Sequence, residues 1–165
     1  SRGFVKEDDQ EEAPFIPPRA PLPDGLPNHV TPRGLALLHS ERDALEAERA
    51  ALTGSDDERR RQSAVINGKL ALLQERIGQA RVADPTHLDT EEVRFGNSVT
   101  FRIVAGPQQG TERRFTIVGV DEASVKEMRV AFTSPIARAL IGAAWALQLG
   151  PNTQQLQVLR IETEG

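Results

Sequence analysis

The chain of 165 residues contains no cysteine and no tyrosine, and it has one tryptophan and three histidines. The absence of cysteine excludes disulfides, thiol catalysis and cysteine-ligated metals. The three histidines (His29, His39 and His87) are scattered, which argues against a histidine metal site, and we expect His29 and His39 on the surface. Aromatic residues make up only 4%, so few side chains can stack on nucleic-acid bases. The composition therefore disfavours several chemistries and indicates none.

Long apolar runs are also missing. No segment approaches the roughly 18 consecutive apolar residues of a membrane-spanning helix. The first 12 residues are acidic and lack the apolar centre of a signal peptide, so we expect a cytoplasmic protein with no membrane partner. A net charge of −4 and a pI near 5.5 disfavour a protein that coats DNA through counterion release.

Proline is concentrated near the N-terminus, where seven of the eleven prolines lie within the first 32 residues. Proline cannot donate to a backbone ladder, and this segment has few large apolar residues. We therefore expect residues 1–29 to form an extended acidic, proline-rich tail that adds little to stability. Two roles stay open: a solvated or loosely docked tail, and a polyproline-type ligand for a partner, since PxxP spacing occurs.

Residues 30–83 have the pattern of two helices joined by a tight turn. Thr31 and Pro32 form a helix start, and Gly54 is suited to end the first helix. Residues 55–58 then form a capping box for a second helix. Apolar residues recur at intervals of three and four at Leu35, Leu38, Leu45, Leu52, Ile66, Leu70, Leu73, Ile77 and Ala80. The pattern predicts an antiparallel coiled-coil hairpin that projects from a separate body.

Residues 84–165 alternate apolar and polar side chains, which is typical of strands. A serine cap, a proline at the first helical position and a terminal glycine predict a short helix at residues 134–142. The predicted fold class is therefore α+β: a helical hairpin followed by a mostly antiparallel sheet with one short helix. The expected strands are Val93–Phe95, Val99–Ile103, Phe115–Val118, Val130–Phe132 and Leu156–Ile161.

Several strings in the sequence are distinctive. In the body they are residues 93–100 (VRFGNSVT), residues 115–119 (FTIVG) followed by Asp121 and Glu122, and residues 134–142 (SPIARALIG). In the hairpin they are residues 31–34 (TPRG) at the start of the first helix and residues 80–84 (ARVAD) at the end of the second. Together they resemble the Gre family (GreA/GreB-like) of bacterial transcript-cleavage factors. The resemblance implies that the body has an FKBP-like fold and that the chain is a monomer whose partner is RNA polymerase. It also implies the DNA-binding function by which the family is described.

The resemblance also implies where contacts lie. The body would dock on the rim of the polymerase secondary channel, and the hairpin tip would enter the channel toward the 3′ end of the nascent RNA. We expect the chain to have no catalytic residue of its own and to bind no cofactor when it is alone. The tip acids would instead help hold a Mg²⁺ ion that is shared with the polymerase. The implied docking residues are Ser134, Pro135, Ile136, Arg138 and Leu140, the implied metal-binding acids are Asp56, Asp57 and Glu58, and the candidate RNA contacts are Arg59, Arg60 and Arg61.

The tip residues also have a plainer explanation. Acids in the first turn of a helix stabilise its dipole, and the three arginines after them are equally explained as solvated partners of those acids. The sequence departs from the family in three places: the hairpin is shorter, the tip motif differs, and residues 143–147 differ. In the family, the tip motif is an Asp and a Glu three residues apart, followed by Asn-Ala. A cleavage factor and a non-cleaving regulator of the same channel therefore both stay open. Prolyl isomerase activity, suggested by the FKBP-like fold, is disfavoured because the five aromatic residues of the body, which include Trp145, suffice merely to build a core.

Overall fold

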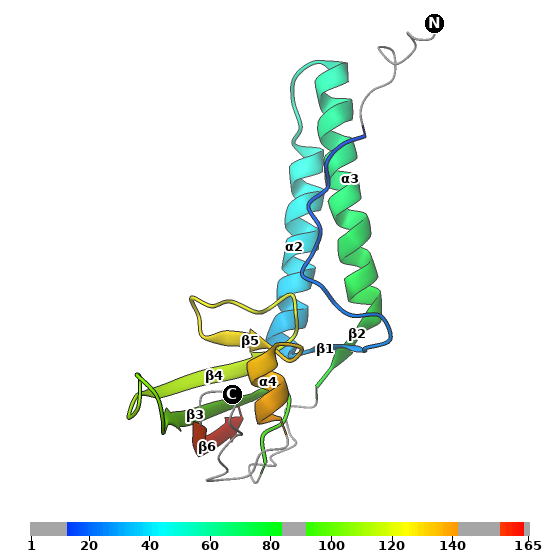
Figure 1. Ribbon diagram of the computed structural model, residues 1–165. Coiled ribbons are helices and arrows are strands. Elements are labelled where there is room, and N and C mark those ends of the chain that lie inside the picture. Colours follow the sequence, from blue (N-terminus) through cyan, green and yellow to red (C-terminus); the bar gives the residue numbers. More distant parts are fainter. Residues whose placement is uncertain (1–12, 84–91, 142–155, 164–165) are drawn as a thin grey trace, which may run out of the picture.

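The protein was analysed as a computed structural model that describes residues 13–83, 92–141 and 156–163. A long helical hairpin stands on a small sheet domain (Figure 1). The elements in chain order are β1 (Asn28–Val30), α2 (Pro32–Ala50), α3 (Asp56–Gln79), β2 (Ala80–Val82), β3 (Asn97–Ile103), β4 (Glu112–Val118), β5 (Arg129–Ala131), α4 (Pro135–Leu140) and β6 (Leu156–Thr163). In the described part of the chain, no helix is both long enough and apolar enough to cross a membrane.

The hairpin confirms the helical prediction. Thr31 caps α2 by accepting a hydrogen bond from Gly34 N at 2.9 Å, and Gly54 adopts a φ of +106° in the turn between the helices. The helices contain 19 and 24 residues. The side chains buried between them belong to the predicted apolar positions, namely Leu38, Leu45, Ile66, Leu70 and Leu73.

The turn leads into a complete capping box at the start of α3. Ser55 Oγ accepts a hydrogen bond from Glu58 N at 3.1 Å, and Glu58 Oε1 accepts one from Ser55 N at 3.2 Å. The hydrogen bond from the Ser55 backbone, followed by the bond with its side chain and the charge of Arg61, holds the pKa of Glu58 below its ordinary value of 4.5. The hairpin tip therefore has a defined helix start.

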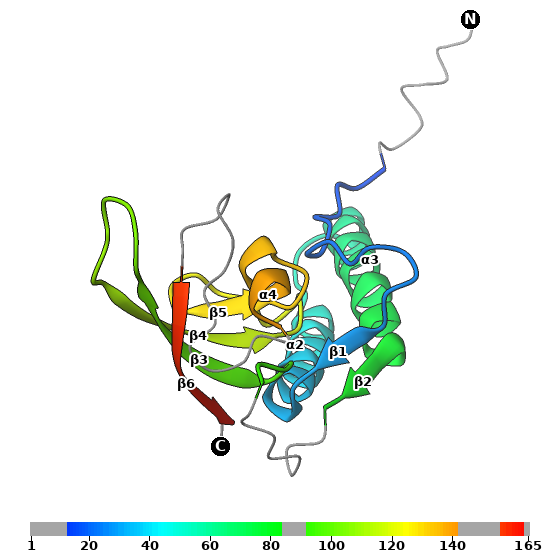
Figure 2. The same ribbon diagram turned by 60° about the horizontal axis from the view of Figure 1, so that its bottom comes forward.

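The sheet has the strand order β5-β4-β3-β6. β3 pairs antiparallel with β4 and β6, whereas β4 and β5 are parallel. Figure 2 shows α4 packed beside this sheet, and its Ala137 and Leu140 side chains join the core formed by the strands. The α+β prediction with a mostly antiparallel sheet and one short helix is confirmed. Gly142, predicted to end that helix, lies outside the described residues.

One of the five predicted strands is wrong. Residues 93–95 form no strand, because the chain turns there: Asn97 Oδ1 accepts a hydrogen bond from Arg94 N at 2.8 Å and Gly96 follows with a φ of +89°. Val93 is nevertheless fully buried, and Phe95 packs against the same core. The alternating pattern reported burial correctly but not backbone conformation. The other four predicted strands correspond to β3, β4, β5 and β6.

A second, two-stranded sheet was not predicted. β1 and β2 pair in parallel, with Asn28 opposite Ala80 and Val30 opposite Val82. Residues 80–84 were expected to end the second helix, but Ala80 already has an extended backbone (φ −65°, ψ 136°), so that helix ends at Gln79. The tail boundary at residue 29 also falls inside β1. This small sheet closes the base of the hairpin.

The connection between β4 and β5 carries two adjacent acids, Asp121 and Glu122, that we call the acidic junction. Glu122 accepts hydrogen bonds from Thr31 Oγ1 at 2.5 Å, from Arg33 at 2.9 Å and from Arg129 at 2.6 Å, and its side chain is 2% exposed. It therefore joins the first turn of α2 to β5 through one buried carboxylate.

Asp121 makes the corresponding contacts on the other side of the hairpin. It accepts hydrogen bonds from Arg76 of α3 at 2.9 Å and from Arg19 of the N-terminal segment at 3.0 Å. Two adjacent acids of the body therefore hold both helices of the hairpin.

Two glycines allow the hairpin base to approach the body this closely. A Cβ at Gly34 would lie 2.6 Å from Glu122 Oε1, and a Cβ at Gly119 would lie 2.5 Å from the carbonyl oxygen of His29. The second obstacle is backbone, so it could move only with β1. Glycine at these positions is required by the packing of the hairpin on the body.

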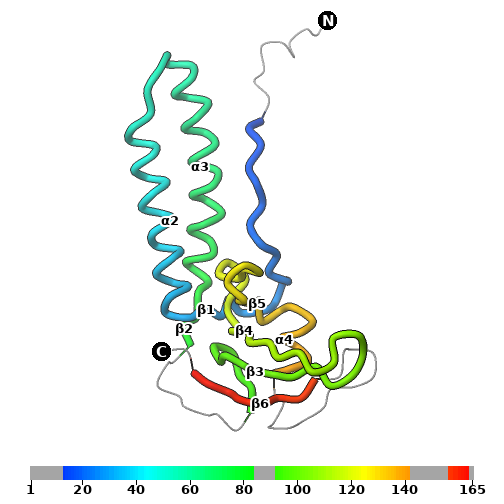
Figure 3. Tube along the Cα trace, turned by 90° about the vertical axis from the view of Figure 1, so that its left-hand side faces the viewer, coloured from blue at the N-terminus to red at the C-terminus, as the bar shows by residue number. Residues whose placement is uncertain are grey.

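The described part of the N-terminal segment, residues 13–27, has no helix or strand and runs beside the hairpin (Figure 3). Its extended form agrees with expectation. Arg19, however, donates two hydrogen bonds to Glu41 of α2, at 2.7 and 3.0 Å, besides its bond to Asp121. These ionic partners were not visible in the composition of the segment, and its small contribution to stability stays a prediction.

The acidic junction generates a stability prediction. Replacing Glu122 by Ala should lower the free energy of unfolding by about 3 kcal/mol, because the buried Arg129 loses a charge partner. The thermal midpoint, measured by circular dichroism, should fall by about 6–12 °C. Glu127→Ala is the matched control, since Glu127 pairs with the same Arg33 but is exposed. It should cost less than about 1 kcal/mol. Equal midpoints for the two variants would contradict the role of the junction.

The capping box generates a pH prediction. Since the folded-state pKa of Glu58 is lower than its unfolded value, the capping bond stabilises the helix start above pH 4.5 and is lost as the pH falls through the folded pKa. Ser55→Ala should raise the pKa of Glu58 partly, and Ser55→Pro further, because proline removes the backbone donor as well and suits the φ of −68°. Carboxyl NMR titration measures these shifts, with Ser63→Ala as control. A Glu58 pKa unmoved by both Ser55 variants would refute the assignment.

Candidate functional site

The three acids predicted at the hairpin tip lie together on the first turn of α3 and are exposed. Asp56 forms an ion pair with Arg59, and Asp57 forms one with Arg60 at 3.0 Å. Glu58 is held by the capping box described above. The structure therefore places the acids where the sequence predicted, but each has a local partner.

The three arginines of the tip follow directly on the acids. Arg59 also donates to the carbonyl oxygen of Gly54 at 2.7 Å, which ties it to the turn between the helices. Arg61 lies near enough to Glu58 to help lower its pKa. Acids and arginines three residues apart thus form a belt of paired opposite charges around the start of α3. In such a belt, the arginines can bind phosphate and the acids can bind a cation in place of their present partners.

The tip does not form a closed metal site by itself. Among the described residues, no group of three or more histidine, aspartate or glutamate side chains is arranged to hold a metal ion. Asp56 and Asp57 can supply at most part of a coordination shell, and Mg²⁺ takes its remaining ligands from water and from phosphate.

The predicted docking helix presents only part of its residues. Ser134 caps α4 by accepting a hydrogen bond from Ala137 N at 3.3 Å, and Pro135 and Arg138 are exposed. Leu140 is fully buried in the sheet core, so its assignment as a docking contact is corrected: its side chain stabilises the body. Ile136 is half-buried against the same core. Trp145 and residues 143–147 lie outside the described residues.

Sequence reasoning missed an aromatic cluster beside the hairpin base. The ring centroids of His29, Phe95 and Phe132 lie 5.4–5.7 Å apart. His29 is thus half-buried against two rings rather than freely exposed. Together with Val82 and Ile141, these rings line a groove of about 750 Å³. Only the resulting fold, not the spacing in the sequence, brings these residues together.

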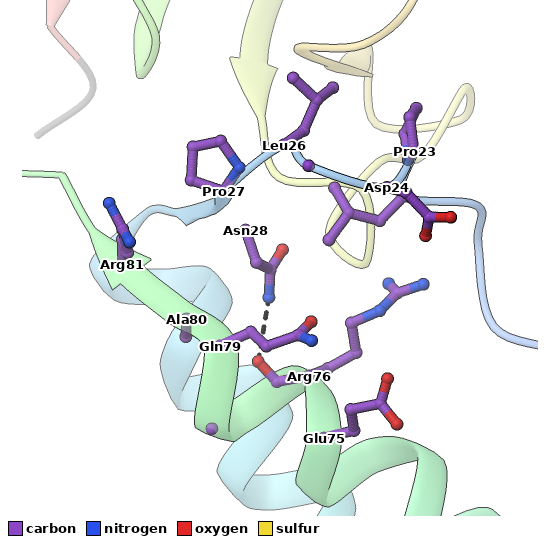
Figure 4. Close-up of a pocket in the computed structure, with 13 residues that line it drawn as sticks. Pro23, Asp24, Leu26, Pro27, Asn28, Glu75, Arg76, Gln79, Ala80 and Arg81 are labelled. Atoms are coloured by element: carbon purple, nitrogen blue, oxygen red, sulfur yellow. Dashed lines mark hydrogen bonds between the residues drawn. The ribbon is translucent and has the colours of Figure 1, made fainter.

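A second pocket, of about 650 Å³, lies where the chain wraps around the end of α3 (Figure 4). Asn28 is 1% exposed there, and its Nδ2 donates to the carbonyl oxygen of Arg76 at 3.0 Å. This bond satisfies one of the last carbonyls of α3, which lack a partner within the helix. Asn28 Oδ1 has no hydrogen-bond partner among the described residues. The described contact of Asn28 is thus structural, and a single asparagine gave no sequence signal for it.

Comparison with known proteins gives a consistent family. Residues 88–145 match the family model described as "Transcription elongation factor, GreA/GreB, C-term". Transcription elongation factor GreA of Hyphomonas neptunium is 43% identical over 77 residues, which cover 47% of each chain. GreA of Chloroflexus aggregans is 31% identical over 132 residues, which cover 70% of this chain and 82% of that protein. The chain thus spans about half the length of several of its GreA relatives.

Two solved structures are also similar in outline. GreA factor homolog 1 (Gfh1) of Thermus thermophilus is 17% identical, with a TM-score of 0.36 over 83% of this chain and 99% of that chain. GreA/GreB of Nitrosomonas europaea is 17% identical, with a TM-score of 0.38 over 81% and 98%. Likenesses at this level do not bear on function. The sequence match to the Chloroflexus protein extends over most of that protein's length, and the chain therefore belongs to the GreA/GreB family of transcription elongation factors.

Proposed function

We propose that this chain binds RNA polymerase at the rim of its secondary channel and inserts the hairpin tip to regulate elongation. The observation that supports the proposal most is the charged tip at the end of a hairpin whose base is fixed to the body. α3 has 24 residues, or a length of about 36 Å at 1.5 Å per residue. The acidic junction holds both helices at their base, so the position of the body determines the position of the tip.

The docking contact is proposed on α4. Pro135 and Arg138 are its exposed residues, while Leu140 and Ile136 anchor the helix to the core. A short helix packed in this way keeps its exposed side chains in a fixed position, which favours a specific contact. An arginine beside a proline is suited to a polymerase surface that carries acidic side chains.

In this proposal the chain does not hydrolyse RNA itself. A Mg²⁺ ion of the polymerase would polarise the phosphate and activate water there, and Asp56 and Asp57 would supply one or two of its ligands. Both carboxylates must first leave Arg59 and Arg60. RNA phosphates that bind these arginines would release the carboxylates, so substrate and metal binding would be coupled.

The alternative is a regulator that occupies the channel without stimulating cleavage. The ion pairs at the tip favour it, because paired carboxylates are weaker metal ligands than free ones. Glu58 is engaged in capping and would have to break two hydrogen bonds to serve as a ligand. Both functions use the same docking surface and differ only at the tip.

The double variant Asp56→Asn, Asp57→Asn distinguishes the two functions. If the tip supplies metal ligands, the variant should bind polymerase normally but lose stimulated RNA cleavage in stalled elongation complexes, by about 100-fold or more. If the chain is a non-cleaving regulator, the parent protein should bind and show no stimulation. Parental stimulation that the double variant retains in full would exclude the metal role of these acids.

The docking proposal is tested separately. Pro135→Asp and Arg138→Glu should each weaken binding to core polymerase by about tenfold or more, because they place a negative charge on the contact helix. Aspartate at the first position of a helix is compatible with folding. Gln108→Asp, in the exposed turn before β4, is the control that matches the charge change of Pro135→Asp elsewhere on the surface. Unchanged affinity of both helix variants in a titration with labelled polymerase would place the contact on another surface.

A further inference from the structure

Residues 15–20, which we call the strap, contact the hairpin and the body at the same time. Ile16 packs against Gly68 in the middle of α3. Arg19 bridges Glu41 of α2 and Asp121 of the acidic junction, and the carbonyl oxygen of Ala20 accepts a hydrogen bond from Arg76. A segment of six residues thus joins α2, α3 and the β4–β5 connection.

The glycine beneath the strap indicates a fitted contact. A Cβ at Gly68 would overlap Ile16 Cδ1 and approach its Cγ1 to 2.8 Å. Glycine is unfavourable in a helix interior, so the room it leaves for Ile16 gives it a structural reason. Gly78, near the end of the same helix, has no atom within 4 Å of the corresponding position. Of the two glycines of α3, only Gly68 therefore lies where a side chain would collide with the strap.

The charges of the strap are partly buried. The Arg19 side chain is 17% exposed, and its Glu41 hydrogen bond is the main reason that its pKa is raised. One guanidinium thereby pairs with a carboxylate of the hairpin and a carboxylate of the body. Pro17 and Pro18 precede it, and proline limits the freedom that the segment loses when it is held in place. The sequence thus combines a stiff segment with one bridging cation.

We propose that the strap acts as a clamp in solution: it holds the hairpin against the body and keeps the face of α3 around Gly68 covered. The strap encloses a groove of about 490 Å³ together with Leu45, Leu72 and Val120. The occupant of this face is therefore a segment of the chain itself. This inference does not depend on polymerase binding.

Spin labels can test the strap in the full chain, because the protein has no native cysteine. Labels at Phe15→Cys, an exposed position in the strap, and Gln108→Cys report the distance between the strap and the body. The parent should give one narrow distance distribution. Arg19→Ala and Gly68→Gln should each broaden it by about twofold or more, since a released segment samples many positions.

Gly78→Gln is the matched control for Gly68→Gln, because it introduces the same helix-forming residue on α3 away from the strap. It should leave the distribution narrow. Circular dichroism must show unchanged helix content in all variants, and Arg102→Ala, which removes an exposed arginine from β3, controls for loss of charge. A broad distribution in the parent, or a narrow one in either Arg19→Ala or Gly68→Gln, would overturn the proposal.

Discussion

A single carboxylate, that of Glu122, is the contact on which the placement of the hairpin depends. It is buried between Thr31 and Arg33 at the start of α2 and Arg129 of β5. A buried charge is costly unless its hydrogen bonds are satisfied, so few positions of α2 relative to the sheet are acceptable. Asp121, the preceding residue, adds the bond to α3. The direction of a long hairpin is therefore set by interactions at one end.

Two of the strings that resemble the Gre family meet here, although they lie far apart in the sequence. The TPRG string at residues 31–34 supplies the hydroxyl, the guanidinium and the glycine that surround Glu122, and this glutamate follows the FTIVG string at residues 115–119. In this structure these residues hold the hairpin on the body. In the proposed function, the tip decides between a cleavage factor and a non-cleaving regulator, and the tip motif is one of the places where this sequence differs from the family pattern it resembles. Membership of the family therefore does not by itself assign chemistry to the tip.

Local signals in the sequence predicted the elements that depend on local physics. Helix caps at Thr31, Ser55 and Ser134 and the apolar spacing of both long helices correspond to α2, α3 and α4. The alternating pattern failed at residues 93–95, because a turn can bury side chains as well as a strand can. β1 and β2 have three residues each, too few to show a period, and they flank the hairpin that brings them side by side.

Contacts between distant segments were beyond the reach of the sequence. The tip ion pairs differ from these contacts, because they join residues three apart and the sequence offered them as one of two explanations for the arginines. Leu140 belonged to a string that resembles a docking motif, yet amphipathic packing of a six-residue helix directs it into the core. Arg19 lay in a segment whose composition is typical of disorder, and its two carboxylate partners come from 22 and 102 residues away.

The most direct test of the central claim is the distance between the hairpin tip and the body, measured with spin labels at Gln62→Cys near the tip and Gln108→Cys in the sheet domain. Both positions are exposed, and the chain needs no removal of native cysteines. If the acidic junction fixes the hairpin, the parent gives one narrow distance distribution, and Glu122→Gln, which keeps the shape but removes the charge, broadens it. A parent distribution as broad as that of the variant would contradict the account.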